Sequence, residues 1–299
     1  MEKTTPGNHA PEGGVPARER GRFFVISTGP AGPPTATLQA IETLKRVEAV
    51  AAPAEQVRLF AEYIGDKPVL FDPWKGVFDF RGKQMRDLDE EEKRLFQHER
   101  FLLREERVGR VRGLLSEGKD VGLLETGNPC LFGPGHWYTE LFDARDVVLI
   151  PGMGCDAAAM AALGKSTIPA YDVRFLLQTY PFSLLGEDLR DTGLLRELAR
   201  NPCTIVFYMA LWNIPSFFAS LREVLPRDMP CAVVFWAGYP DRERVVRGTL
   251  GDMEGRLRGE EEDFMGLVLV GRFLDGRPYE ESMRRLTGPG KPASSRGRQ

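Results

Sequence analysis

Short apolar runs alternate with stretches of helical periodicity along most of the chain, and this alternation restricts the fold more than any other feature. FFVIS, from Phe23, is followed by a turn rich in glycine and proline, a helical stretch TATLQAIETLKRV and a second short strand, AVAAP. DVGLLET and DVVLIPG flank HWYTELF, and TIVFYMA, CAVVFWAG and LVLVGRFL follow in the last third. Alternation of this kind predicts an α/β fold with mixed or mostly parallel sheets.

The chain has 299 residues, which suits one large or two medium domains. A natural break follows Pro151-Gly152, where a helix of small residues, CDAAAMAALG, begins. Both ends are rich in Pro, Gly and charge and have little to bury, which is typical of disorder. We therefore expect a disordered arm over 1–20, an N-terminal α/β domain over 21–152, a C-terminal α/β domain over 153–285 and a disordered tail over 286–299.

The balance of charge argues against partners that attract by charge alone. Lys and Arg number 40 against 43 Asp and Glu, for a net charge of -3, so neither nucleic acid nor an anionic membrane is favoured as a partner. No apolar run approaches the ~20 residues that cross a bilayer. The N-terminus has no apolar segment of the kind that a secretory signal needs. We expect a cytoplasmic protein without a membrane partner.

Cysteine and histidine usage gives no sign of a metal centre. Cys130, Cys155, Cys203 and Cys231 are widely spaced, with no CxxC pair, and the chain has 3 histidines without a paired-ligand spacing. We expect four reduced cysteines and no metal site.

Residues 70–105 are highly charged and rich in aromatics, and apolar positions recur at helical spacing from Asp87 to Glu117. The segment has two interpretations. It is either a solvated helix with its approach loop, or an insertion that covers or shapes a substrate pocket, since long excursions often carry function.

Three glycine-rich turns follow predicted strands, at the place where open α/β sheets bind ligands. The turns are GPAGPP from Gly29, ETGNPCLFG from Glu125 and PGMGCD from Pro151. None is a GxGxxG or a GxxxxGK[ST] motif, so dinucleotide-dependent oxidoreductases and nucleoside triphosphate binding are disfavoured. Each turn alone is also compatible with a plain turn or with close helix packing.

The combination of motifs is far more specific. GPAGPP, TGNPCLFG, IPGMGCDAAAMAALG, FYMA and RVVRGTL occur in this order from about Phe23 to Leu274. The chain resembles the tetrapyrrole (corrin and porphyrin) methylase family, which has a GPGDP-type turn, a GDP-type loop, a VPG turn with a small-residue helix, a YMG-type strand end and RVVxGTL. The resemblance implies two α/β domains with a cofactor cleft between them, a homodimer, and a methyltransferase dependent on S-adenosylmethionine that acts on a tetrapyrrole or corrinoid precursor.

The resemblance also implies a set of cofactor-binding residues, carried over motif by motif. They come from the three turns, from the FYMA strand end and from a glycine ten positions before the GTL glycine. The implied residues are Pro30, Thr126, Gly127, Asn128, Leu131, Gly154, Cys155, Met209 and Gly238.

Three departures from the family pattern remove carboxylates. Gly32 replaces the Asp of the first turn, Ala52-Pro53 replaces the YD that ends the second strand in uroporphyrinogen methylases, and Asn128 replaces the Asp of the GDP loop. The catalytic base is therefore unassigned. A non-catalytic regulator that binds the cofactor without turnover is one alternative.

A second alternative is a peptide backbone N-methyltransferase of the same fold, with a peptide rather than a small molecule as acceptor. Arg100 lies at the distance from Gly127 of the catalytic Arg in that branch, but Arg104 stands where the branch has Tyr. Arg100 is the candidate catalytic residue; its other interpretation is an exposed helical charge. Tyr138, Tyr171, Asp172 and Arg174 are candidates for lining the acceptor pocket, whichever atom of the acceptor attacks the methyl group.

Overall fold

The computed structural model of the chain describes residues 20–168 and 173–275. They form two compact units, and each unit draws on three separate segments of the chain. Among the described residues, unit 1 takes 20–26, 42–124 and 134–150, and unit 2 takes 27–41, 125–133 and 151–275. The arm expected over 1–20 lies outside the described residues except for Arg20, and the tail expected over 286–299 lies wholly outside them.

Unit 1 is built on a four-stranded sheet of order β2-β5-β1-β6. β1 pairs with β6 and β2 with β5, both in parallel. β1, β2 and β5 are buried along their whole length, which explains why the sequence shows them as continuous apolar runs. The strands are β1 (Phe23–Ser27), β2 (Ala49–Ala51), β5 (Val121–Glu125) and β6 (Val147–Ile150), and the helices α1 (Leu38–Arg46), α2 (Ala54–Leu59), α3 (Ala61–Ile64), α4 (Glu90–Ser116) and α5 (His136–Thr139).

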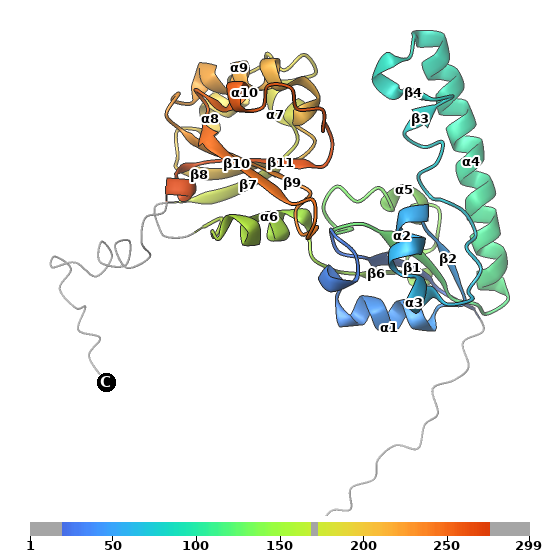
Figure 1. The fold of residues 1–299 in the computed structure, drawn as a ribbon. Coiled ribbons are helices and arrows are strands. Elements are labelled where there is room, and N and C mark those ends of the chain that lie inside the picture. The colour runs from blue at the N-terminus through green and yellow to red at the C-terminus, as the bar shows by residue number, and fades with distance from the viewer. Residues whose placement is uncertain (1–19, 169–172, 276–299) are drawn as a thin grey trace, which may run out of the picture. The chain divides into compact units, whose positions relative to one another are not determined.

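The helix expected between Asp87 and Glu117 is confirmed as α4. It begins at a capping box, in which Asp89 accepts from the Glu92 amide and the Glu92 side chain accepts from the Asp89 amide. Its first half extends past the sheet and packs on the hairpin of β3 (Asp79–Phe80) and β4 (Lys83–Gln84) (Figure 1). A small core of Phe80, Leu88 and Phe96 holds the two together.

Unit 2 is built on a mixed five-stranded sheet of order β10-β9-β11-β8-β7. Its β7–β8 pair is parallel and its other pairs are antiparallel. Helices α7 to α10 cover one face and α6 the other, so unit 2 has three layers (Figure 1). The elements are α6 (Cys155–Leu163), β7 (Phe175–Thr179), α7 (Pro181–Leu185), α8 (Gly193–Leu198), β8 (Cys203–Phe207), α9 (Ile214–Val224), β9 (Pro230–Phe235), β10 (Arg244–Thr249), α10 (Met253–Arg256) and β11 (Gly266–Val270).

Alternate residues of the central strands supply two separate cores. Ile205, Phe207 and Val233 point to the layer of α7 to α10, whereas Val206 and Val234 point to α6. Successive side chains of a strand face opposite sides of the sheet, so strands that are apolar on both faces produce continuous apolar runs. The prediction of an α/β fold is confirmed in both units.

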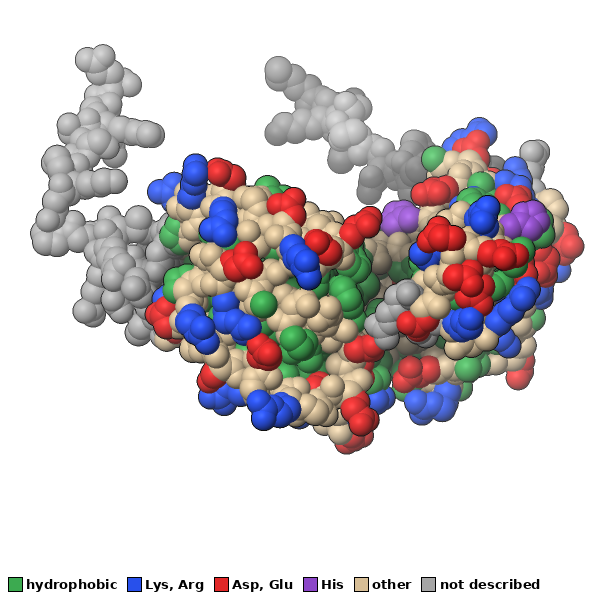
Figure 2. All heavy atoms as spheres, turned by 90° about the horizontal axis from the view of Figure 1, so that it is seen from above, with side chains coloured by type: hydrophobic (Ala, Val, Ile, Leu, Met, Phe, Trp, Pro, Cys, Tyr) green, Lys and Arg blue, Asp and Glu red, His purple; other side chains and the backbone are tan. Residues whose placement is uncertain are grey.

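Charged side chains of both signs are interspersed over the surface that Figure 2 displays, in keeping with the near-neutral composition. Of the helices that the structure describes, none combines the length and the apolar character needed to span a bilayer.

Candidate functional site

Five loops that follow the carboxyl ends of strands come together in unit 2. Three follow β1, β5 and β6, and two follow β8 and β9. The nine residues implied as cofactor-binding all lie in these loops or, for Cys155, at the first residue of α6 directly after one of them. The loops span residues 28–37, 126–133, 151–154, 208–210 and 236–243.

Ser27, the last residue of β1, ties three of the loops together. Its hydroxyl donates to the carbonyl oxygen of Gly127 at 2.5 Å and lies 3.3 Å from the amide of Gly29. The Gly127 amide in turn donates to the Gly29 carbonyl at 3.0 Å. A Cβ at Gly152 would collide with the Ser27 hydroxyl, so this position in the turn after β6 requires glycine. Pro30 is buried directly beside this junction.

One further contact joins the loops after β6 and β5, and another brings in the loop after β9. A Cβ built on Gly154 would lie 3.5 Å from the Cβ of Asn128. A Cβ built on Gly238 would lie 3.3 Å from the Cβ of Ala31 and 3.5 Å from that of Ala158, on α6. The loop after β9 therefore lies against the loop after β1 and against α6, and the structure brings the residues expected in different motifs close to one another.

Apolar side chains line the same region. Leu131 and Cys155 pack on the core that contains Tyr208. The ring of Phe132 lies 5.1 Å from that of Tyr208 and 5.8 Å from that of Tyr180, between ring centroids. Next to Tyr208, the side chain of Met209 is 37% exposed, so an apolar thioether is left at the surface where five loops meet. Flat aromatic ligands are bound by surfaces of this composition.

Backbone strain is concentrated in these loops. Phe132, Met209 and Trp236 have φ angles of 55°, 51° and 51°, in the left-handed region that residues with a Cβ seldom adopt. Each conformation costs about 1–2 kcal/mol. Three such residues in the loops after β5, β8 and β9 indicate that the loop shapes are fixed by more than local preference.

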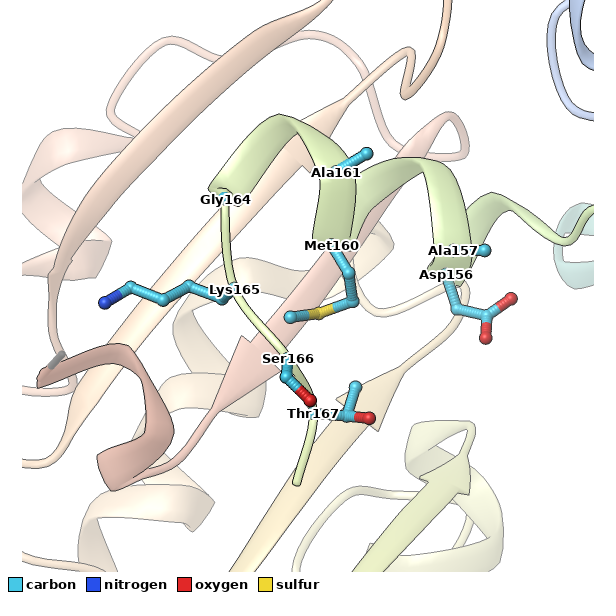
Figure 3. Close-up of a pocket in the computed structure, with 8 residues that line it drawn as sticks. All are labelled: Asp156, Ala157, Met160, Ala161, Gly164, Lys165, Ser166 and Thr167. Carbon is cyan, nitrogen blue, oxygen red and sulfur yellow. The ribbon is translucent and has the colours of Figure 1, made fainter. Parts of the chain in front are cut away.

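Asp156 adds a carboxylate to the group of loops. It lies on the first turn of α6 and lines a hollow of about 690 Å³ together with Met160, Lys165 and five neighbouring residues (Figure 3). Its second carboxylate oxygen accepts from the side-chain amide of Gln178 at 2.9 Å, which fixes its orientation. Burial and then the charge of Asp156 raise the pKa of the Cys155 thiol to about 11, and the same two causes raise the pKa of Tyr208.

The positions that lost a family carboxylate have local structural roles. The side-chain oxygen of Asn128 accepts from the Cys130 amide at 2.9 Å, as an Asp in a turn would. Gly32 has φ 87° and ψ -161°, a conformation in which an Asp would be strained. Pro53 is the N-cap of α2, two residues after the end of β2.

Arg100 and Tyr138 lie in the other unit. Tyr138 is buried, and its hydroxyl donates to the Pro73 carbonyl at 2.6 Å and accepts from Arg107 at 2.9 Å, so it belongs to the core of unit 1. Arg174 is exposed just before β7, and Tyr171 and Asp172 lie outside the described residues. All four cysteines are free, and no group of His, Cys, Asp and Glu among residues 20–168 and 173–275 is arranged to hold a metal.

Sequence reasoning missed several side chains that shape the site. Ser27 is a buried hydroxyl at the end of an apolar run, and a buried polar residue is a signal that could have been used. Asp156 is the acidic residue in a helix of small residues, CDAAAMAAL. The third group consists of the aromatic residues Phe132, Tyr180 and Tyr208. They come from three segments far apart in sequence, so no local pattern reveals that their rings lie together.

Comparisons with known proteins place these observations in a family. Residues 22–254 match the family of tetrapyrrole (corrin/porphyrin) methylases. A precorrin-4 C(11)-methyltransferase of Rhodococcus erythropolis is 30% identical over 168 residues, which are 55% of this chain and 66% of that enzyme. The chain therefore spans just under two thirds of that relative.

Two solved structures share the fold. A cobalt precorrin-4 methyltransferase, a cobalamin biosynthetic enzyme, superposes with a TM-score of 0.63 at 21% identity, covering 85% of this chain and 96% of that one. A uroporphyrin-III C-methyl transferase from Thermus thermophilus, complexed with S-adenosylhomocysteine, superposes with a TM-score of 0.55 at 23% identity, covering 85% of this chain and 99% of that one.

Proposed function

This chain belongs to the tetrapyrrole (corrin/porphyrin) methylase family, and we propose that it transfers a methyl group from S-adenosylmethionine to a tetrapyrrole of the precorrin class. The observation that carries the proposal is the meeting of five strand-end loops in unit 2, at the motifs that match the family. The relatives named for precorrin-4 methylation support the acceptor class.

The residues present fit S-adenosylmethionine. The position of a Cβ on Gly127 has no atom within 4 Å, so the loop after β5 leaves open space above its backbone. Met209, Leu131 and Cys155 offer apolar contact to the adenine, and the glycines let backbone amides approach the polar parts. The proposed contacts are Pro30, Thr126, Gly127, Asn128, Leu131, Gly154, Cys155, Met209 and Gly238. When bound, the cofactor supplies an electrophilic methyl group on its sulfonium.

The chain's own residues have to align the acceptor, exclude water and remove one proton as the carbon of the macrocycle gains its methyl group. We assign the proton to the carboxylate of Asp156. This group is half-buried, is oriented by Gln178, and lines the hollow beside α6. It stands in the same group of loops as the proposed cofactor contacts, because the Gly154 backbone lies against it.

The domain limits, the location and the oligomeric state belong to the same proposal. We assign the α/β domains to residues 21–152 and 153–285, with unit 2 borrowing the loops after β1 and β5. We also propose a cytoplasmic location. A homodimer is proposed from the family resemblance.

The alternatives have less support. A peptide N-methyltransferase would use Arg100, which lies in unit 1 next to a second arginine rather than a tyrosine. A regulator without turnover would not need the oriented carboxylate of Asp156.

The deciding experiment is isothermal titration of the full chain with S-adenosylmethionine and S-adenosylhomocysteine, followed by detection of S-adenosylhomocysteine formed with a precorrin acceptor. We expect micromolar binding and turnover. Absence of binding to both would overturn the proposed function, and binding without turnover on any precorrin would favour the regulator.

A further inference from the structure

Three arginines follow one face of α4. Arg100, Arg104 and Arg107 stand at i, i+4 and i+7, a spacing that places side chains on the same side of a helix. All three are at least partly buried, and Arg104 and Arg107 are 9% and 6% exposed. The rings of Trp137 and Phe71 lie against this face.

Arg107 is satisfied by neutral groups. Its guanidinium donates to the carbonyl oxygens of Pro73 at 3.1 Å and Lys75 at 2.8 Å, and to the hydroxyl of Tyr138 at 2.9 Å. These bonds hold the segment before the hairpin against α4. Its role is accounted for by the fold.

Arg100 and Arg104, which we refer to as the arginine pair, are not satisfied in this way. Arg104 donates to the Trp137 carbonyl at 3.0 Å, and its carboxylate neighbour, Glu140, is 4.0 Å away and mostly exposed. Arg100 makes no hydrogen bond or ion pair with any residue in the described part of the chain. The Nε atoms of both side chains are buried without an acceptor.

Two acidic residues near the pair on α4, Glu99 and Glu106, have other partners. Glu99 pairs with Arg81 at 2.9 Å, and Glu106 with Arg110 at 3.9 Å. Both guanidiniums stand over the ring of Trp137, at 5.4 and 4.9 Å from its centroid.

Two cations held together in a half-buried place, with buried donors left over, are unfavourable unless an anion joins them. Contact with the ring of Trp137 offsets only part of this cost. Burial and the charge of Arg104 together lower the pKa of Arg100, the direction expected when counter-charge is lacking.

We propose that the arginine pair, with Trp137, binds a carboxylate side chain of the tetrapyrrole acceptor. This inference rests on the proposed function and adds a binding site to it. The guanidinium is planar and presents donors in a fork that matches a carboxylate. Precorrins carry acetate and propionate groups around the ring, so an acceptor of this class brings several carboxylates. Arg100, the more exposed member, contacts the carboxylate, and the more buried Arg104 contributes a second positive charge.

The test is titration of the full chain with uroporphyrin, a stable porphyrin with acetate and propionate side chains, by its fluorescence at low salt. We expect Arg100→Gln to weaken binding about tenfold, since the lost bond is charge-assisted. Coproporphyrin, which has fewer carboxylates on the same ring, should bind the parent more weakly and lose less in the variant.

Two controls separate binding from folding. Arg110→Gln removes a cation of the same helix that already has Glu106 as partner, and should change the affinity for uroporphyrin by less than about twofold. Arg100→Gln should keep or raise the Tm, because it removes an uncompensated charge from a half-buried place. A structural role would lower the Tm instead.

The outcomes are distinct. Equal affinity of parent and Arg100→Gln for uroporphyrin, equal loss in Arg110→Gln, or no binding by the parent would overturn the arginine pair as a carboxylate site. Displacement of uroporphyrin by inorganic phosphate at similar concentration would assign the site to free anions and overturn its assignment to the acceptor. Titration with S-adenosylhomocysteine, which should be unchanged in both variants, tests the proposed function separately.

Discussion

At the residue scale, Gly127 offers the sharpest test of where the cofactor binds. The space at its Cβ position is empty, and its φ of 79° is matched by Gly118, at the end of α4, which also has open space. Gly127→Ala and Gly118→Ala should therefore cost the same in stability, about 1 kcal/mol. Only Gly127→Ala places a methyl group where the cofactor is proposed. We therefore expect this variant alone to lower the affinity for S-adenosylhomocysteine, at least about tenfold by isothermal titration. Equal affinities in the two variants would move the site elsewhere.

The proposed role of Asp156 as proton acceptor is tested by replacing its carboxylate with an amide. Asp156→Asn keeps the size of the side chain but removes the proposed proton acceptor, so we expect kcat to fall about a hundredfold. Affinity for S-adenosylhomocysteine should stay close to that of the parent, since no cofactor contact is assigned to this side chain. Steady-state kinetics and calorimetry on the same preparation measure both. A variant with the kcat of the parent would remove Asp156 from the mechanism.

The cysteines allow a test by pH. Burial and Asp156 raise the pKa of Cys155 to about 11, so at pH 8 its thiolate fraction is below that of an ordinary thiol, and Cys130 is exposed. Iodoacetamide at pH 8 should label Cys130 and leave Cys155 unmodified. Labelling of Cys155 should increase as the pH rises toward 11. Peptide mass spectrometry measures each site, and equal labelling at pH 8 would contradict the raised pKa of the half-buried Cys155.

Residues of the candidate site were predictable where they stand in motifs and not where they meet through space. Gly127, Asn128 and Gly154 were found because each lies in a short turn with a recognisable order. The contact between Gly154 and Asn128, and the joint made by Ser27, depend on strand order in the sheet. No local pattern contains that order, so these relations needed the structure.

At the scale of elements, the beginning of α4 is set by a signal that the sequence carries. The capping box of Asp89 and Glu92 satisfies amides that the helix itself leaves open. Asp89→Ala should lower the free energy of unfolding by about 1 kcal/mol in urea. Glu105→Ala, on an exposed position in the middle of the helix, should change it by less than about 0.5 kcal/mol. Similar losses for both would mean that the cap contributes nothing specific.

Strands were predictable in the middle of the sheets and poorly at one sheet's edges. β1, β5, β8, β9 and β11 are apolar runs because both their faces are covered. β7 and β10 are the two edges of the unit 2 sheet, and no residue of β10 is buried. Edge strands mix charged and apolar residues, and the RVVRGT of β10 therefore reads as a connecting segment. The hairpin β3–β4 was missed because each strand has only two residues.

At the scale of the whole molecule, a ligand that binds only the folded chain raises its stability. S-adenosylhomocysteine at a hundred times its Kd should add about 2.7 kcal/mol. Because the unfolding entropy is about 2.1 cal/mol/K per residue, the Tm of a chain of this size should rise by about 4–5 °C. A thermal melt in the presence of NAD serves as the control and should show no shift, because the chain lacks GxGxxG. A shift with NAD and none with S-adenosylhomocysteine would point to another cofactor class.

Each unit takes residues from three segments of the chain, and this interleaving has a consequence for how the protein is made. The unit 2 sheet is assembled from residues 175–270. Residues 27–41 and 125–133, which belong to the same unit, therefore leave the ribosome well before any strand of that sheet. Synthesis runs from the N-terminus. An unfinished chain therefore has the glycine turns but lacks the unit 2 sheet against which they pack. Prematurely terminated products are therefore expected to leave the cell's pool of methyl donor untouched.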